Sequence, residues 1–294
     1  MDTEINDERE WFFSKIKDMT YNSERTYRNK YNQMVKAIGL PVMKMSVEDF
    51  AKFSKKLNPN TASTYLVVIS KVRQFKGEPT DDFINWRREN LDPLIQRYTK
   101  KVNNYINENV ILPTVQQLQE HENKWYSLGK WNYYIAHFLI NHYFTRNLDV
   151  NVKIVKNLDE TNDKDNFLVI KHKPNQIIYI RNDYKTVWKY GTKTFIIKDR
   201  KFFKAVNEQL KTSPYLVADH DDQNKFYRFL QYALFPEMNE GLYLKVHIKN
   251  IKDKTDLLTI AERRGTSEKL LLTSYNLEYP GSDQVESNLY KEEE

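Results

Sequence analysis

The chain has 294 residues, 40% of them hydrophobic, and a formal net charge of +6 with a sequence pI of about 9.0. This length suffices for one large domain or two smaller ones, and the basic balance favours a polyanionic partner, most simply nucleic acid. The absence of cysteine excludes disulfides and thiolate metal sites, and no apolar run approaches the roughly 20 residues of a membrane span.

Two further absences in the sequence narrow the function. No GxxxxGK[ST] or GxGxxG pattern is present, which argues against a nucleotide-driven enzyme. The polar, acidic N-terminus, Met1 to Glu10, lacks the features of a signal peptide. We therefore expect a soluble, intracellular protein with no metal, no cofactor and no membrane partner. These features do not distinguish nucleus, cytoplasm and viral replication site.

Residues 1–77 have the periodicity of several short helices. Ser23 and Ser46 are candidate N-caps, and residues 61–75 form a further predicted helix. One face of that helix is polar and basic. It is either the solvated face of a helical bundle or a DNA contact, and we assign three side chains to DNA binding: Lys71, Arg73 and Lys76.

The next segment, residues 78–109, contains Pro79, Pro93 and several basic residues, and we expect a helical connector. A second domain then begins where Thr114 can cap a helix. Residues 131–144 form a strongly apolar helix that ends just before Arg146.

After Leu148 the hydrophobic period changes to that of strands. Three strands are predicted, at residues 166–171, 176–181 and 192–197, and helices return at residues 201–210, 224–234, 242–251 and 254–264. The predicted fold is mainly α with a small antiparallel β-sheet. Its parts are an N-terminal helical domain (1–77), a connector (78–109), an α+β domain (110–280) and a disordered acidic tail (281–294).

The stretch from Thr259 to Asn276 resembles the closing motif of tyrosine recombinases of the phage-integrase type. In that family a helix ends in Leu-Gly-His-Ser, and the nucleophilic tyrosine follows on the next helix. Here Thr266–Ser267 follow Gly265, and Tyr275 stands ten residues after Gly265, which is the family's usual spacing.

Two more stretches resemble the family's catalytic domain. His142 to Asp149 is similar to the first arginine box, with Arg146 in place and Phe144–Thr145 where the family has Gly-Leu. The family also carries a lysine on a β-hairpin, and Lys185 and Lys193 flank the predicted turn at Tyr190–Gly191. We choose Lys185, because it is expected on the strand that leads into the turn.

The N-terminal part resembles the helical core-binding (SAM-like) domain of these recombinases, at Asn22–Tyr27 and Asn60–Tyr65. In all, the resemblance covers about residues 7–280. It implies a site-specific recombinase or integrase of a virus or mobile element that acts on double-stranded DNA as a homo-oligomer.

The resemblance also implies the chemistry. Tyr275 would attack a phosphodiester and form a 3′-phosphotyrosine link, Arg146 would clamp the phosphate oxygens, and Lys185 would protonate the leaving 5′ oxygen. No metal or external energy source is needed, because the phosphotyrosine link stores the bond energy.

The family's second box, His-x-Leu-Arg-His, has no clear counterpart. An ungapped alignment puts Tyr243 there, whereas a shifted one uses Lys245 in place of the arginine, with His247 nearby. Both alignments lack the second arginine, and Thr266 replaces the third-box histidine. Loss of one such donor commonly costs about 100- to 1,000-fold in rate. Lys245, Arg263 and Arg264 could compensate for the missing donors, although a lysine offers a point charge and not a planar fork. The favoured interpretation of Arg263 and Arg264 is a solvated helix end or a contact to the DNA backbone.

Two alternatives therefore stay open beside an active recombinase. One is a catalytically degenerate protein of recombinase fold that serves as an architectural or packaging DNA-binding factor. The other is an unrelated helical module that binds nucleic acid or protein.

Overall fold

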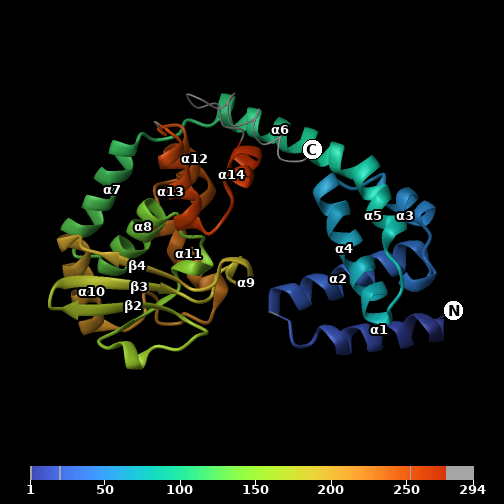
Figure 1. Ribbon diagram of the computed structural model, residues 1–294, viewed down its shortest axis with the longest axis horizontal. Helices are drawn as coiled ribbons and strands as arrows, with labels where there is room; N and C mark the ends of the chain where they lie inside the picture. Colours follow the sequence, from blue (N-terminus) through green and yellow to red (C-terminus); the bar gives the residue numbers. More distant parts are fainter. Residues whose placement is uncertain (1, 20, 252, 276–294) are drawn as a thin grey trace. The chain divides into compact units, whose positions relative to one another are not determined.

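A computed structural model describes residues 2–19, 21–251 and 253–275 of the chain. It divides into two compact units, Met1–Glu108 and Asn109–Glu294. Each unit has its own hydrophobic core, so we describe each by itself (Figure 1). Among the residues described, no helix is both long and apolar enough to cross a membrane.

The first unit is built from helices wherever it is described. Its elements are α1 (Asp2–Ile16), α2 (Tyr21–Ile38), η1 (Val42–Lys44), α3 (Val47–Ser54), α4 (Pro59–Lys76), α5 (Asp81–Trp86), η2 (Arg87–Leu91) and α6 (Asp92–Asn109). Local signals set their ends. Ser46 and Asp49 form a capping box at the start of α3, while α4 starts after its N-cap Asn58 and ends at Gly77, which is left-handed with φ 75°.

The first half of the expected connector, residues 83–95, contributes to the first unit's core. Phe83 and Leu91 are buried in the same cluster as Phe12, and Trp86 packs edge-on against Phe50 with ring centroids 5.4 Å apart. The expected boundary at residue 77 is therefore too early, because the aromatic residues of α5 and η2 complete this core.

The second unit holds the remaining helices and one sheet. Its elements are α7 (Val115–Ser127), α8 (Trp131–Tyr143), η3 (Leu148–Val150), β1 (Val152–Val155), η4 (Leu158–Glu160), β2 (Asn166–His172), β3 (Asn175–Arg181), α9 (Val187–Tyr190), β4 (Lys193–Ile197), α10 (Arg200–Thr212), α11 (Gln223–Ala233), α12 (Glu240–Ile248), α13 (Lys254–Arg264) and α14 (Glu268–Tyr275).

The sheet has the order β1-β2-β3-β4 and is mixed. β2–β3 and β3–β4 are antiparallel as expected, but β1 pairs in parallel with β2, so the prediction of a purely antiparallel sheet is wrong. The sequence patterns did not reveal β1, which is only four residues long. A parallel neighbour needs a connection that returns to the same end of the sheet, and residues 156–165 provide it.

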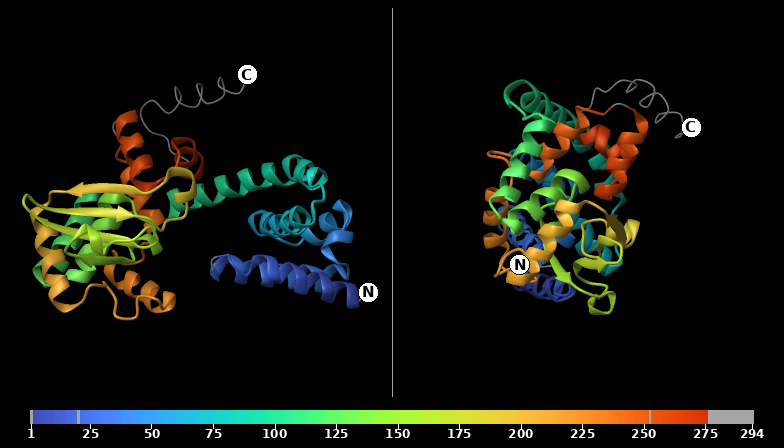
Figure 2. Two further views of the ribbon diagram at one scale, coloured as in Figure 1. Left: turned by 60° about the horizontal axis from the view of Figure 1, so that its bottom comes forward. Right: turned by 90° about the vertical axis from the view of Figure 1, so that its left-hand side faces the viewer.

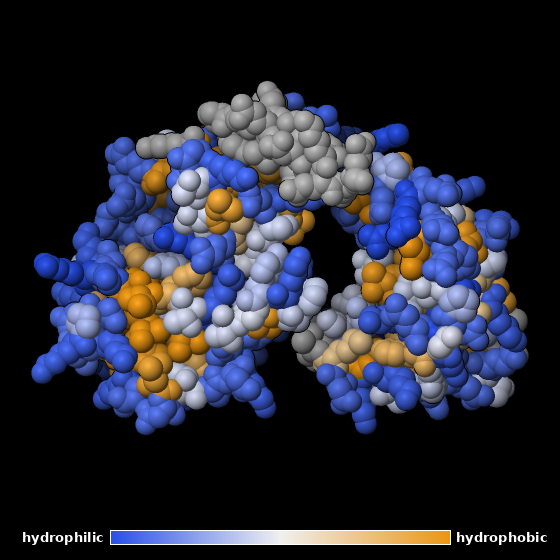
Figure 3. All heavy atoms as spheres, viewed as in Figure 1, coloured by the Kyte–Doolittle hydropathy of each residue, from blue (hydrophilic) through white to orange (hydrophobic). Residues whose placement is uncertain are grey.

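The two faces of the sheet differ. α10 packs on β1, β2 and β3, and α8 packs on α10, which buries Leu139, Leu168 and Tyr179 in the main core (Figures 1 and 2). The opposite face holds a small apolar cluster, and Ile196 of β4 is 57% exposed. Figure 3 shows an apolar patch over the strands.

Candidate functional site

Arg146 follows a sharp turn at the end of α8. The C-cap residue Phe144 is left-handed, with φ 52°, and the Thr145 hydroxyl donates to the Leu139 carbonyl at 2.9 Å. A left-handed backbone favours glycine, which is the residue the resembled motif has here. In this chain Phe144 is instead held by burial, with its ring 5.1 Å from that of His247.

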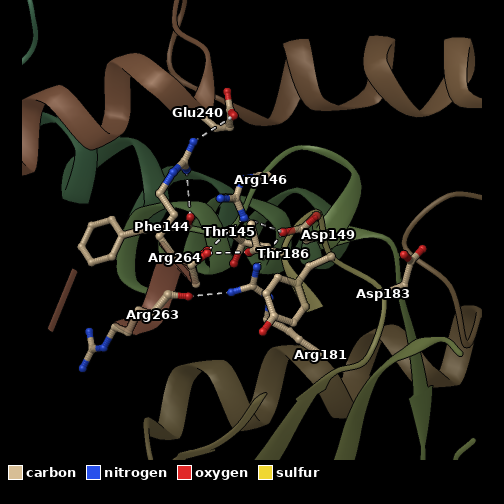
Figure 4. Close-up of polar contacts among 12 residues, drawn as sticks. Phe144, Thr145, Arg146, Asp149, Arg181, Asp183, Thr186, Glu240, Arg263 and Arg264 are labelled. Atoms are coloured by element: carbon tan, nitrogen blue, oxygen red, sulfur yellow. Dashed lines mark hydrogen bonds and ion pairs between the residues drawn. The ribbon is translucent and has the colours of Figure 1, made fainter. Parts of the chain in front are cut away.

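The guanidinium of Arg146 points to the end of α13. Its Nη1 donates to the Arg264 carbonyl at 3.0 Å, across 118 residues of sequence (Figure 4). Arg264 reciprocates: its Nη1 donates to the Phe144 carbonyl at 3.0 Å, and its Nη2 lies 3.2 Å from the Glu240 carboxylate. Two arginines thus link the ends of α8 and α13. Each donates to a carbonyl at the end of the other helix, where backbone carbonyls lack a partner within the helix.

Arg181 and Asp149 form the buried centre of this site, and no sequence pattern indicated a role for either. Arg181 is fully buried at the end of β3, donates to the Asp149 carboxylate at 2.6 Å and to the Arg263 carbonyl at 2.6 Å, and stacks on the Tyr184 ring (Figure 4). Alternate residues of a strand face the same side, and Ile177 and Tyr179 of β3 are buried. This alternation could have predicted from the sequence that Arg181 is buried too. We call Arg146, Arg181, Arg263, Arg264 and Asp149 the arginine corner.

Burial of the Asp149 carboxylate is unfavourable for its ionised form. Burial raises the pKa of its carboxyl, and the nearby charges of Arg181 and Arg146 only partly oppose this effect. The desolvation of this carboxylate is not fully offset by its attraction to the arginines. Such a perturbed buried group is typical of a functional site, where the geometry of the side chains matters more than their contribution to stability.

The segment between β3 and β4 docks on the end of α13. The Thr186 hydroxyl donates to the Gly265 carbonyl at 2.5 Å, and the Tyr184 ring lies against Gly265, where an added Cβ would be 2.7 Å from Cε2. Lys185 is exposed in the turn before α9 rather than on a strand, because β3 ends at Arg181. Lys193 begins β4, and its Cε would be 3.5 Å from the same Cβ, so it approaches this corner from the other side of the hairpin.

Of the second-box candidates in α12, Tyr243 and Lys245 are buried and His247 is partly buried. Lys245 is 4% exposed, and burial lowers its pKa. His247 shares a 2.8 Å hydrogen bond between its Nε2 and Oδ1 of Asn141, and burial lowers its pKa to about 4, so it is neutral at physiological pH. Tyr243 is fully buried, and its hydroxyl accepts a hydrogen bond from the Phe235 amide.

A buried polar network lies behind the arginine corner on α7 and α8. The Glu122 carboxylate is 3.3 Å from Nδ1 of His137, 3.0 Å from Nε2 of His142 and 3.3 Å from Nδ2 of Asn141. Burial opposes ionisation of Glu122, but the two histidines outweigh it and bring its pKa to about 2. The network fixes the last turns of α8, and the His142 carbonyl in turn accepts from Nη1 of Arg263 at 2.8 Å.

The five predicted DNA contacts fall into two groups. Arg73 holds the first unit together: it donates to the Met45 carbonyl at 3.0 Å and pairs with Asp82 at 3.3 Å. Arg264 is buried and Arg263 is partly buried, and each donates to a carbonyl at the end of α8, so this helix end is not simply solvated. A contact of Arg263 to the DNA backbone stays a prediction. Two predicted contacts reach the surface of α4: Lys71, which is partly exposed, and Lys76, which is exposed and lies over the Trp11 ring at 4.0 Å.

Tyr275 is the last residue of α14, which packs on α13 through Leu271 and Leu272. Its side chain and residues 276–294 lie outside the described part of the structure, so the predicted nucleophile and acidic tail are not placed. Within the described residues, no three histidine or carboxylate side chains are grouped as metal ligands would be.

Comparisons with known proteins do not assign the chain to a family. No family model and no curated protein matches the chain. Among solved structures, a crystal structure of XerA recombinase matches over 98% of each chain, at 10% sequence identity and a TM-score of 0.34. A TM-score of this size does not establish a common fold.

Proposed function

We propose that this chain binds duplex DNA and that its second unit is a strand-cleaving domain of tyrosine-recombinase type, with Tyr275 as the attacking residue. The observation that supports this best is that segments far apart in the sequence meet at the end of α13. Arg146 bonds to the Arg264 carbonyl, and Thr186 bonds to the Gly265 carbonyl from 79 residues away. Three motifs that resemble the family separately in the sequence therefore meet in one place.

The charge of this place suits a phosphate. Four guanidiniums lie in one network with two carboxylates, those of Asp149 and Glu240, which leaves an excess of two positive charges. Such an excess at a partly buried position attracts an anion and stabilises charge that develops on phosphate oxygens. The side chain of Arg146 is 16% exposed. Arg146 is the residue we propose to clamp the phosphate, and a hairpin lysine, Lys185 or Lys193, would protonate the leaving oxygen.

The test is covalent trapping on a nicked suicide DNA substrate. We expect a protein–DNA adduct from the full chain, its loss in Tyr275→Phe, and its retention in the matched control Tyr279→Phe. Absence of an adduct under conditions where the protein binds DNA would refute cleavage. An adduct that persists in Tyr275→Phe would refute the assignment of the nucleophile.

A second candidate function is a DNA-binding factor of the same build that does not cleave. It is favoured by the partners of the cationic residues: the guanidiniums of Arg181 and Arg264 bind internal carbonyls and carboxylates, and His247 is neutral and partly buried. Groups of this kind hold the fold in this chain instead of facing a substrate. This candidate predicts DNA binding without an adduct, and binding that Tyr275→Phe leaves unchanged.

DNA binding itself is tested by its salt dependence. The logarithm of affinity should fall linearly with the logarithm of salt concentration. Lys71→Gln and Lys76→Gln should each reduce the slope by about one if each lysine neutralises a phosphate. An affinity that salt does not change would refute a backbone contact.

A further inference from the structure

The segment between β3 and β4 displays a tryptophan to solvent. Trp188 is 82% exposed, whereas the other four tryptophans of the chain are all partly covered. An indole buries a large apolar area when it packs against another surface. A tryptophan that is so exposed in a segment held by hydrogen bonds is therefore a candidate contact for a binding partner.

The surroundings of Trp188 are basic. Residues 184–193 contain three lysines and no acidic residue. Lys185 and Lys189 are exposed on either side of the tryptophan, and Nζ of Lys189 lies 5.3 Å from the centre of the Tyr190 ring. An aromatic ring among lysines matches a nucleic acid, whose bases stack on the ring while its phosphates meet the ammonium groups.

The segment is held at its base, so the tryptophan is presented in a defined place. The Tyr184 hydroxyl donates to the Gly191 carbonyl at 2.6 Å, and the Gly191 amide donates to the Val187 carbonyl at 2.7 Å. Together with the bond from Thr186 to Gly265, these contacts anchor both ends of the short helix α9. A preorganised aromatic loses little conformational freedom on binding.

The distance along the chain connects this feature to the arginine corner. Trp188 is two residues from Thr186, and two residues span at most about 7 Å of backbone. The Thr186 hydroxyl bonds to the carbonyl of Gly265, which directly follows Arg264 of the arginine corner. Successive base steps along one strand are about 3.4 Å apart. A base next to a phosphate held at the arginine corner is therefore within reach of the indole.

We propose that Trp188 stacks on a base beside the phosphate that the arginine corner holds, by wedging into that step of duplex DNA, while Lys185 and Lys189 contact the flanking phosphates. This rests on the proposed DNA-binding function. Apolar and aromatic wedges of this kind partly unstack a base step and kink the duplex, and they make the step easier to open where stacking is weakest.

The experiment measures duplex affinity of the full chain at several salt concentrations. We expect Trp188→Ala to weaken binding roughly 5- to 150-fold without changing the salt slope, because stacking releases no counterions. Trp188→Phe should retain most of the affinity. Lys189→Gln should instead lower the slope by about one. Tyr232→Ala is the matched control, an exposed aromatic (69%) on α11, and should bind like the wild type.

The outcomes separate this proposal from the one on which it rests. A wild-type protein that binds no duplex overturns both. A wild type that binds, with an affinity that Trp188→Ala leaves unchanged, overturns the wedge alone, as does a Trp188→Phe variant that loses as much affinity as the alanine variant. Circular dichroism of Trp188→Ala should match the wild type, because the side chain packs on so little of the protein.

Discussion

Gly265 offers a direct test of how the arginine corner is built. It caps α13 with φ 67°, and an added Cβ would lie 2.7 Å from Cε2 of Tyr184 and 3.4 Å from its Cδ2. We expect Gly265→Ala to cost about 1–2 kcal/mol for the left-handed backbone and about 1–3 kcal/mol for overpacking, or roughly 2–5 kcal/mol of unfolding free energy.

The overpacking arises because Tyr184 has no room to retreat. Its hydroxyl is bonded to the Gly191 carbonyl at 2.6 Å, and the guanidinium of Arg181 lies 4.7 Å from its ring centre. Displacing the ring would also displace the loop that carries Lys185 and Trp188. We therefore expect Gly265→Ala to weaken DNA binding more than its loss of stability alone would explain.

The assay is urea unfolding of the full chain, with Gly129→Ala as the control in the same unit. Gly129 has φ 64° but only ordinary contacts, the nearest at 3.7 Å, so its variant should show the backbone cost alone, about 1–2 kcal/mol. Adding Tyr184→Ala to Gly265→Ala should cancel the overpacking, a coupling of about 1–3 kcal/mol. Equal costs for the two glycine variants, or no coupling in the double variant, would refute this account.

Three further predictions concern stability. Burial holds the pKa of His247 at about 4 while the unfolded chain takes a proton near the usual value, so His247 by itself should lower the unfolding free energy by about 2 kcal/mol from about pH 7.5 to about pH 5. His121 and His137, whose pKa values burial also lowers, add to this fall in the wild type. In urea titrations at both pH values, the fall for His247→Gln should be smaller than that of the wild type by about 2 kcal/mol. Asp149→Asn leaves Arg181 buried without its carboxylate and should cost about 3–5 kcal/mol, whereas replacing both residues by leucine and methionine should cost less than the sum of the single changes, as a double-mutant cycle would measure. Thr114→Ala removes a capping box from α7 and should lower the urea midpoint by an amount equivalent to about 1 kcal/mol.

Much of the fold follows from the sequence because its causes are local. The predicted strands at 166–171, 176–181 and 192–197 are confirmed within a residue of each end, since alternation of apolar side chains reports a sheet face directly. Thr114 and Ser46 cap the helices that the sequence assigned to them, because a cap acts only on the next three residues.

Only the tertiary structure decided what the charged residues do. Sequence context ranked Arg263 and Arg264 as surface residues and gave Arg181 no role, yet all three bind carbonyl or carboxylate groups from distant parts of the chain. The same holds for the parallel strand β1 and for the end of the first unit at Glu108, which depend on packing partners far away in sequence. An arginine on a helix end looks the same in sequence whether it faces water, a phosphate or a buried carbonyl, because its partner is set by long-range packing and not by its neighbours in the chain.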